Sequence, residues 1–360
     1  MFAGQMLKEV LRLLPTVFLS LCCFFAGAQD RYFTQFYSIP AGLNPALTGG
    51  YSGKYRVSAV YRDQWRGPLE KPVTTLGASV DLRFEINPEA AYNDAASVGL
   101  QFFSDHAGPF KLSTNVIGLS GAFHKSLSSD DLQVISAGFS LQAVQRNLLY
   151  EHLFFQDQFN GIDAFDHPTQ EDLPENNFTY GDLNFGLNYT ITPAPKWRVY
   201  LGGGIHHIMQ PEVSFYKKDD DERQQEKSSS KLFRNYTVHG GALIPLATTL
   251  ALSPRAFFAL QGPHLVSNLG ANLILEPGVD ENFKLHLGGW FRMVRDFDRS
   301  IKPDAIGLLV GINIRDLLLG LSYDINIRDI INYPTGQGAL EFSVSYFGDY
   351  ESENDACPSF

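Results

Sequence analysis

The sequence predicts an all-β protein, a transmembrane antiparallel outer-membrane β-barrel of about fourteen strands. Three observations lead to this prediction. Apolar and polar residues alternate with a period of two from residue 54 to residue 348, and the connections between the alternating segments are short and long in turn. The 28 Phe, 16 Tyr and 32 Gly among 360 residues also suit strands and the turns that join them.

Residues 1–28 have the pattern of a secretory signal peptide. Lys8 and Arg12 form its positive region, residues 13–25 its apolar region, and Ala26-Gly27-Ala28 a small-residue cleavage site. The apolar run is shorter than the roughly 20 residues that a membrane-spanning helix needs. We therefore expect cleavage after Ala28, export from the cytoplasm and a mature chain that begins at residue 29.

Cys22 and Cys23 raise the alternative of a lipoprotein. However, Leu21 precedes Cys22, at a position where lipoprotein processing requires a small residue. After cleavage of the signal peptide only Cys357 of the 3 cysteines would remain, which excludes a disulfide within the mature chain.

Residues 29–53 are predicted to be a separate N-terminal segment in the periplasm. Tyr32, Phe33, Phe36 and Tyr37 give it too many aromatic side chains for a free tail. Two alternatives remain open for it: folding into the periplasmic mouth of the barrel, or docking of a periplasmic partner. Residues 54–348 are predicted to form the barrel, and residues 349–360 a C-terminal tail.

The predicted strands alternate between an apolar face and a face of charged, small polar and glycine residues. In the segment that begins at Lys284, for example, Leu287 and Phe291 lie on one face and His286 and Arg292 on the other. Pro245 and Pro254 interrupt three segments, which are therefore the weakest assignments. The centres are Val57, Ala78, Leu100, Leu119, Phe139, Phe185, Leu201, Val238, Ala256, Ala271, Leu287, Val310, Leu321 and Val344.

Connection lengths predict the two ends of the barrel. Short connections at residues 192–196, 247–248 and 315 alternate with long polar ones at residues 147–177, 210–234, 295–304 and 326–337. Outer-membrane barrels have short turns on the periplasmic side and long loops outside. We therefore expect the first strand to begin and the last strand to end on the periplasmic side.

A soluble β-sandwich is the competing architecture, because its strands alternate in the same way. Its polar face would be open to bulk water, whereas here that face is rich in Gly, Ser and Asn with scattered single charges, as a crowded lumen would be. Several segments also carry an aromatic residue at one end, as the interfacial girdles of barrels do. These residues are Tyr61, Phe84, Trp197, Tyr323 and Tyr346.

Net charge and motifs exclude several functions. A formal charge of −11 without a basic cluster argues against nucleic acid as a partner. His206 and His207 are adjacent, so on a strand they point to opposite faces and cannot bind one metal ion. The acidic run at residues 219–222 lacks the alternation and glycine of an EF-hand loop, and we expect a solvated loop there. Gly202-Gly203-Gly204 has no following helix or lysine, so it predicts a strand kink or a close side-chain approach.

No catalytic motif is visible, since no serine lies in a nucleophile-elbow context. We predict that the protein is not an enzyme and needs no cofactor or metal ion. Its expected non-protein neighbour is outer-membrane lipid.

The two ends of the mature chain resemble the PorP/SprF family, which consists of outer-membrane proteins of the type IX secretion and gliding motility system. The resemblance covers the mature chain in length and layout, but its specific motifs lie at the ends. The matching residues are Gln35 and Phe36, Asn44-Pro45-Ala46 and Gly49, Tyr61-Arg62-Asp63-Gln64-Trp65, Pro72-Val73-Thr74-Thr75, and Cys357, Pro358 and Phe360.

The resemblance implies a barrel that works with other type IX secretion components to export or anchor large surface proteins with C-terminal sorting domains. The motif residues also have a structural interpretation. Asn44-Pro45 can form a turn before the first strand, Arg62 can stack on Trp65 at the rim, and Gln64 can satisfy backbone groups. The alternative function is an outer-membrane channel or a transporter of hydrophobic compounds.

Overall fold

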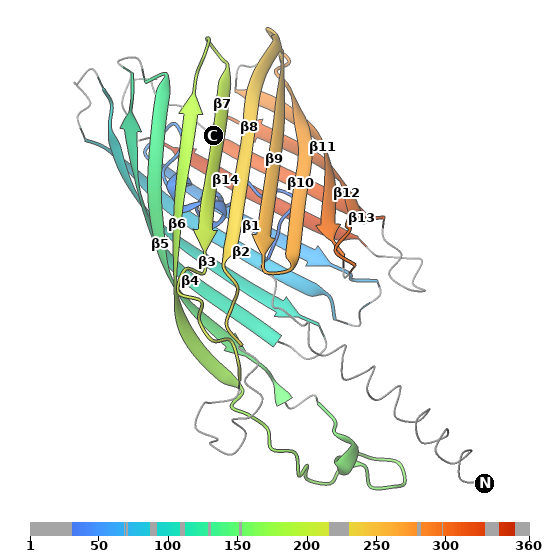
Figure 1. Cartoon of the computed structure of the whole chain (residues 1–360). Coiled ribbons are helices and arrows are strands. Elements are labelled where there is room, and N and C mark those ends of the chain that lie inside the picture. The colour runs from blue at the N-terminus through green and yellow to red at the C-terminus, as the bar shows by residue number, and fades with distance from the viewer. Residues whose placement is uncertain are drawn as a thin grey trace. The chain divides into compact units, whose positions relative to one another are not determined.

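A computed structural model describes residues 31–67, 69, 71–86, 92–108, 112–128, 131–150, 153–215, 230–278, 282–296, 298–327 and 338–349. Within these residues fourteen strands form one closed barrel, in which each strand pairs antiparallel with its sequence neighbours and β1 pairs with β14 (Figure 1). The predicted fold class is confirmed. No helix in the described part of the chain is long and apolar enough to cross a membrane.

Each of the fourteen predicted segment centres lies in the corresponding strand. The strands are β1 (Tyr55–Gln64), β2 (Val73–Glu85), β3 (Ala95–Ala107), β4 (Leu112–Ser126), β5 (Gln133–Asn147), β6 (Asn177–Ile191), β7 (Arg198–His206), β8 (Asn235–Ala247), β9 (Leu250–Gln261), β10 (His264–Leu275), β11 (Phe283–Arg295), β12 (Ile301–Ile314), β13 (Leu317–Asn326) and β14 (Ala339–Gly348).

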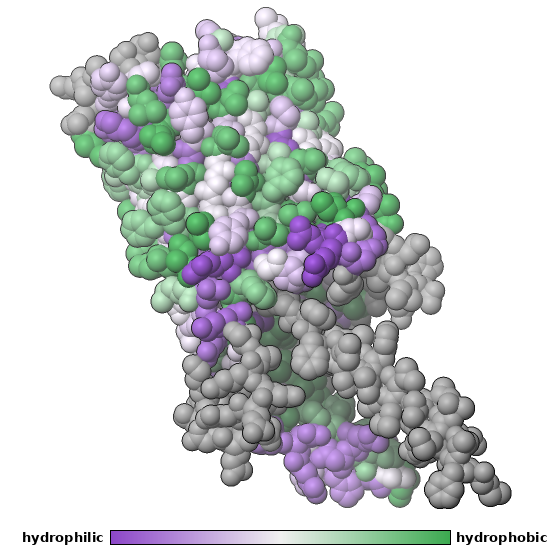
Figure 2. Space-filling model, in the orientation of Figure 1, coloured by the Kyte–Doolittle hydropathy of each residue, from purple (hydrophilic) through white to green (hydrophobic). Residues whose placement is uncertain are grey.

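The period-two pattern separates an outer apolar face from an inner polar one. Leu100, Ile117 and Leu201 point outward and are each more than half exposed, whereas Ser140 and Asn188 point into the lumen and are buried. Figure 2 shows hydrophobic residues over much of the strand wall in this view. The five predicted girdle aromatics are also exposed on the outer face. In a closed barrel the outer face needs apolar side chains for contact with lipid.

The two ends of the barrel differ in their connections. The short turns at residues 192–197, 248–249 and 315–316 lie at one end, here called the short-turn end, where β1 begins and β14 stops. The connections at residues 148–176, 207–234 and 327–338 lie at the other end, the long-loop end, together with the two-residue turn at 262–263. The connection predicted at residues 295–304 also lies at the long-loop end, but it is short, because β11 ends at Arg295 and β12 begins at Ile301. The other connections named in the sequence fall on the ends that alternation predicted.

The three segments with the weakest sequence signal are regular strands, β8, β9 and β10. Proline is tolerated because the ladder changes beside it. The register between β8 and β9 shifts between Pro245 and Ala247. Pro254 pairs with Ala271 on β10, while the pairing of β9 with β8 is interrupted opposite it. A proline that cannot donate to a ladder is accommodated at such irregular positions.

The N-terminal segment lies inside the barrel, and of the two alternatives given for it, folding into the barrel agrees with this position. Thr34 contacts β13 and β14, Asn44 contacts β6, β7 and β8, and Gly49 contacts β2. These strands stand on different sides of the closed ring, so residues 31–53 must lie within it (Figure 1). We call residues 31–53 the plug.

The plug runs from the long-loop end to the short-turn end. Arg31 Nη1 lies 3.0 Å from Asp105 Oδ2, close to the end of β3 at the long loops. Gly49 contacts Asp81 and Arg83 near the end of β2 at the short turns. Two short helices bend the segment, α2 (Pro40–Leu43) and η2 (Pro45–Leu47). The described amino-terminal end thus lies opposite the end of β14, not beside it.

Candidate functional site

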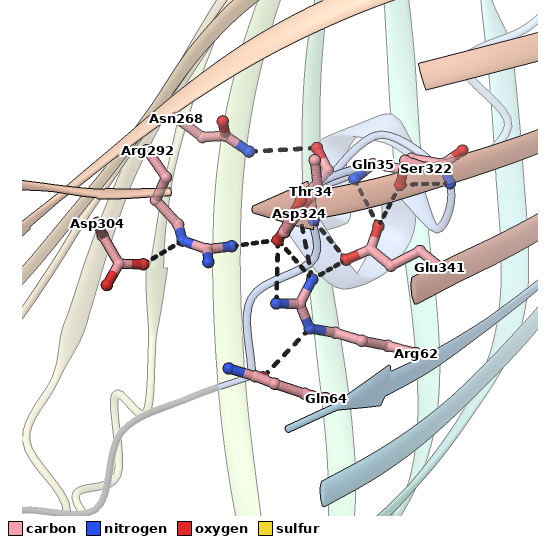
Figure 3. A network of polar contacts seen from close by, with 10 residues as sticks. All are labelled: Thr34, Gln35, Arg62, Gln64, Asn268, Arg292, Asp304, Ser322, Asp324 and Glu341. Carbon is pink, nitrogen blue, oxygen red and sulfur yellow. Dashed lines mark hydrogen bonds and ion pairs between the residues drawn. The ribbon is translucent and has the colours of Figure 1, made fainter. Parts of the chain in front are cut away.

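The plug is held by a network of charged side chains in the long-loop half of the lumen (Figure 3). Arg62 on β1 pairs with Asp324 on β13 at 3.2 Å and also with Glu341 on β14. Arg292 on β11 bridges Asp324 at 2.7 Å and Asp304 at 2.6 Å. Two guanidinium groups therefore face three carboxylates, and the five side chains come from five strands, β1 and β11 to β14.

The plug backbone completes this network. The N–H groups of Thr34 and Gln35 donate to the two carboxylate oxygens of Glu341, at 2.7 and 2.9 Å. The Thr34 hydroxyl donates to Asp324 at 2.6 Å, and Asn268 Nδ2 donates to the Thr34 carbonyl at 3.2 Å. Hydrogen bonds to charged groups are stronger than those between neutral groups. The carboxylates of Asp324 and Glu341 therefore hold both this part of the plug and the two arginines in place.

Burial makes the pairing necessary. Arg62, Asp324 and Glu341 are nearly inaccessible to solvent. A buried charge is costly unless it is paired and hydrogen-bonded, and the loss of one partner from such a network typically costs about 3–5 kcal/mol. The network therefore couples the position of the plug to the stability of the barrel wall.

Gln35 and Phe36 lie next to this network and face different strands. Gln35 Nε2 donates to Ser322 Oγ at 3.1 Å, and its Oε1 accepts from Ser343 Oγ at 2.7 Å. Phe36 packs on Phe257 with ring centroids 5.3 Å apart and meets the edge of Trp290 at 5.5 Å. One residue thus supplies polar contacts and the next an aromatic anchor.

The Asn44-Pro45-Ala46 motif forms a turn inside the lumen, against strands β6, β7 and β8. Asn44 Oδ1 accepts from the Ala46 N–H at 2.9 Å, which caps η2. Asn44 Nδ2 donates to the Leu187 carbonyl at 2.9 Å and contacts His239 Nε2 at 3.0 Å. The predicted turn exists, and it lies against the barrel wall, well before the first strand begins.

Glycines in the wall make room for this turn. A Cβ on Gly186 would lie 1.8 Å from Asn44 Oδ1, and one on Gly138 would lie 2.4 Å from the Pro45 carbonyl oxygen. Real Cβ atoms do not approach other atoms this closely, so these two positions require glycine while the turn is in place.

Gly49 ends the plug at the short-turn end. Its φ of +68° favours glycine, and a Cβ would lie 2.0 Å from Ser97 Oγ. Its N–H donates to Asp81 Oδ2 at 3.1 Å, and its carbonyl accepts from Arg83 Nη1 at 3.0 Å. Arg56 pairs with the same carboxylate of Asp81. A second buried charge cluster therefore holds this end.

Arg62 and Gln64 make contacts other than those that the motif suggests. Arg62 points into the lumen instead of stacking on Trp65. Gln64 Oε1 accepts from Arg62 Nε at 3.3 Å and supports the network. Trp65 has a φ of +59°, and its N–H donates to the Gly338 carbonyl at 3.0 Å across the rim. Cys357, Pro358 and Phe360 lie outside the described residues.

The sequence alone did not identify several residues that hold the plug. These residues are Asp324, Glu341, Arg292 and His239. Each is one of several polar residues on the inner face of its strand, and this pattern predicts a lumen position but no partner. Thr34 and Glu341 are 307 positions apart, and no local spacing connects them.

The two histidines lie at the end of β7, which stops at His206, and His207 has a φ of +57°. His206 Nε2 contacts the Leu43 carbonyl at 3.2 Å, and His207 Nδ1 contacts Asp182 at 2.5 Å. A Cβ on Gly202 would lie 2.7 Å from His239 Nε2, as a close side-chain approach requires. The described residues contain no group of three or more potential metal ligands, and residues 219–222 are outside them.

Solved structures with a similar fold are barrels of low sequence identity. A FadL homologue of Pseudomonas aeruginosa is 11% identical, with a TM-score of 0.47, and the match covers 84% of this chain and 92% of the FadL homologue. The toluene transporter TbuX of Ralstonia pickettii is 10% identical, with a TM-score of 0.46 and coverage of 86% and 92%. BamA of Haemophilus ducreyi, lacking POTRA domains 1–3, is 9% identical, with a TM-score of 0.42 and coverage of 82% and 70%.

Among curated proteins no match is found. The sequence of residues 25–346 matches the family described as type IX secretion system membrane protein PorP/SprF. This range contains the plug, its charge network and nearly all of the closed barrel. The chain is an outer-membrane β-barrel and belongs to the PorP/SprF family of type IX secretion system membrane proteins.

Proposed function

We propose that the protein is a closed barrel that assists export or surface anchoring of large proteins with C-terminal sorting domains through protein–protein contacts. Its partners are other type IX secretion components and a large secreted surface protein, within outer-membrane lipid. Membership of a family of type IX secretion system membrane proteins supports the proposed role in protein export. The proposal includes no catalysis, no cofactor and no nucleic acid.

The observation that carries the proposal is the plug. Thr34, Gln35, Asn44 and Thr48 are almost completely buried, and they contact strands on different sides of the ring. A solute pathway through the lumen would require the plug to leave its place, and therefore the buried hydrogen bonds of Thr34 to Asp324 and Glu341 to break. A plugged lumen favours work at the outer surfaces and mouths of the barrel.

An exposed aromatic cluster on the long connection between β5 and β6 offers one such surface. Phe154 and Ile162 are 70% and 84% exposed. Phe165 packs on Phe159 and Phe154 with ring centroids 5.1 and 5.7 Å apart. Aromatic side chains held by one another in a loop are suited to anchor a partner protein.

A deletion strain tests the proposal. Without the gene, a large surface protein should remain inside the cell, while uptake of small solutes stays normal. Complementation with the double variant Phe154→Ser, Ile162→Asp should restore less export than the wild type at equal barrel abundance. Met209→Asp, which changes an exposed apolar residue in a different long connection, serves as the control.

The alternative, a channel or a transporter of hydrophobic compounds, predicts the opposite phenotype. A strain that exports all its surface proteins but fails to take up a nutrient would contradict our proposal and support the transporter.

A further inference from the structure

A cavity of about 90 Å³ lies between the plug and the barrel wall. Its lining includes Tyr37 of the plug, His239 on β8, Arg255 on β9 and His286 on β11. Leu318 and Phe347, at the short-turn ends of β13 and β14, line it as well, so it extends toward that end of the lumen.

The charge of the lining is one-sided. In a chain with a formal charge of −11, the described residues that line the cavity include two arginines and two histidines and neither Asp nor Glu. The charge of Arg56 is matched by Asp81. Arg255 contacts the face of Tyr37, with its guanidinium carbon 3.9 Å from the ring centroid. A ring face supports the cation but supplies no acceptor for its N–H groups.

Arg255 has hydrogen-bond donors without a partner. Its Nε and Nη1 atoms are buried and have no acceptor among the described residues. A guanidinium group carries five donors and no acceptor, so the groups that would satisfy it are anionic or carbonyl oxygens.

His239 adds a donor whose hydrogen can be assigned. Asn44 Oδ1 accepts from the Ala46 N–H, which fixes the orientation of the amide and makes Nδ2 the donor. Because Nδ2 lies 3.0 Å from His239 Nε2, that ring nitrogen is the acceptor and the hydrogen is on Nδ1. His239 is only 1% exposed, and Nδ1 is buried without a partner in the described part of the chain.

The rest of the lining combines further polar atoms with apolar walls. His286 Nε2 and Asn272 Oδ1 are also buried without a partner among the described residues. Asn272 Nδ2 donates to the Tyr37 hydroxyl at 3.2 Å. Leu309 and Leu318 contribute apolar wall. A ligand that matches both the hydrogen-bonding atoms and the apolar walls would carry one anionic group and a short apolar group.

We propose that this cavity is a binding site for a short-chain carboxylate that enters from the short-turn end. The carboxylate accepts hydrogen bonds from Arg255 and from the ring N–H of His239, and the apolar chain contacts Leu309, Leu318 and Phe347. The site rests on the lining of the cavity and is independent of the proposed role in secretion.

Isothermal titration of the refolded protein in a non-ionic detergent tests the site, with acetate, butanoate and hexanoate as probes. We expect saturable binding that tightens with chain length, by at most about fourfold for each buried methylene. Hexanamide, which has a similar chain without the charge, should bind at least about tenfold more weakly than hexanoate, because charged hydrogen bonds are the stronger ones.

Matched arginine variants locate the anion. Arg255→Gln should weaken hexanoate binding at least about tenfold, and Arg255→Lys should keep most of it because the charge remains. Arg146→Gln should have no effect, since Arg146 lies on the inner face of β5 near the long-loop end and also has a buried Nε without a partner. Absence of saturable binding, equal affinity for hexanamide, or unchanged binding by correctly folded Arg255→Gln would overturn the proposal.

Discussion

At the scale of single residues, Arg62 shows why a motif can be recognised before its role is known. Its place in Tyr61-Arg62-Asp63-Gln64-Trp65 predicts a rim residue that stacks on the tryptophan. The side chain points into the lumen, where Asp324 and Glu341 attract it. Those carboxylates come from strands near the other end of the sequence, so local spacing carries no information about the pairing.

The variant Arg62→Gln should lower the free energy of unfolding by about 3–5 kcal/mol, because it leaves buried carboxylates without their cation. Arg66→Gln is the matched control. It removes a neighbouring arginine whose side chain is 70% exposed and whose pair with Asp63 is screened by water, so its effect should be small. Denaturant titration of the refolded barrel measures both variants, and equal losses of stability would contradict the importance of the network.

Gly186 gives a second residue-scale prediction. Alanine at this position would place a methyl group 1.8 Å from Asn44 Oδ1, so the plug turn or the strand must shift. We expect Gly186→Ala to destabilise the folded protein by about 1–3 kcal/mol, as overpacking does. Gly289→Ala is the control, because a Cβ there meets no atom within 4 Å. The same titration compares them, and a neutral Gly186→Ala would mean that the turn does not require this glycine.

At the scale of elements, the strands could be predicted and the position of the plug could not. A strand in a barrel wall has one lipid face and one lumen face, so its own residues record both environments. Even β9 follows this rule, although Pro254 weakens its signal. The plug has no periodic pattern, because its neighbours change from residue to residue. Tyr32 and Phe36 indicated a docked segment, but their partner Phe257 lies far away in the sequence.

Strand β11 allows a direct test of the two faces. Leu287 is exposed on the outer face, and His286 lines the inner cavity. Leu287→Arg should reduce stability by roughly 2–4 kcal/mol if the residue lies near the middle of the bilayer. His286→Ala should cost clearly less, because it removes no buried ion pair. Urea titrations of both refolded variants measure the difference, and equal losses would mean that the two faces of β11 are misassigned.

At the scale of the whole molecule, the plug changes the expected topology. The short turns and the end of β14 lie at one end, and Arg31 lies at the other, among the long loops. If the long loops face the exterior, as in other outer-membrane barrels, the described amino-terminal end is also near the cell surface. The sequence predicts which connections are short and which are long. It predicts a periplasmic position for residues 29–53, whereas Arg31 lies at the long-loop end.

Cysteine labelling in intact cells tests this arrangement in a Cys357→Ser background. Single cysteines at Phe165 and at Arg31 should react with a membrane-impermeant maleimide, because both positions lie at the long-loop end. A cysteine at Thr248, in a short turn at the opposite end, should react only after the cells are lysed. Labelling of Thr248 but not of Phe165 in intact cells would reverse the topology, and protection of Arg31 alone would contradict its position at the outer mouth.

The central claim is that the plug closes the lumen, and conductance across a planar lipid bilayer tests it most directly. The wild-type barrel should insert without stepwise openings, since passage requires the buried contacts of Thr34, Gln35 and Asn44 to break. A variant that lacks residues 31–50 serves as the positive control and should conduct once it is inserted. Silent wild-type barrels beside a conducting deletion variant are the result we predict. Frequent large openings of the wild-type protein would contradict a closed lumen and would favour a channel.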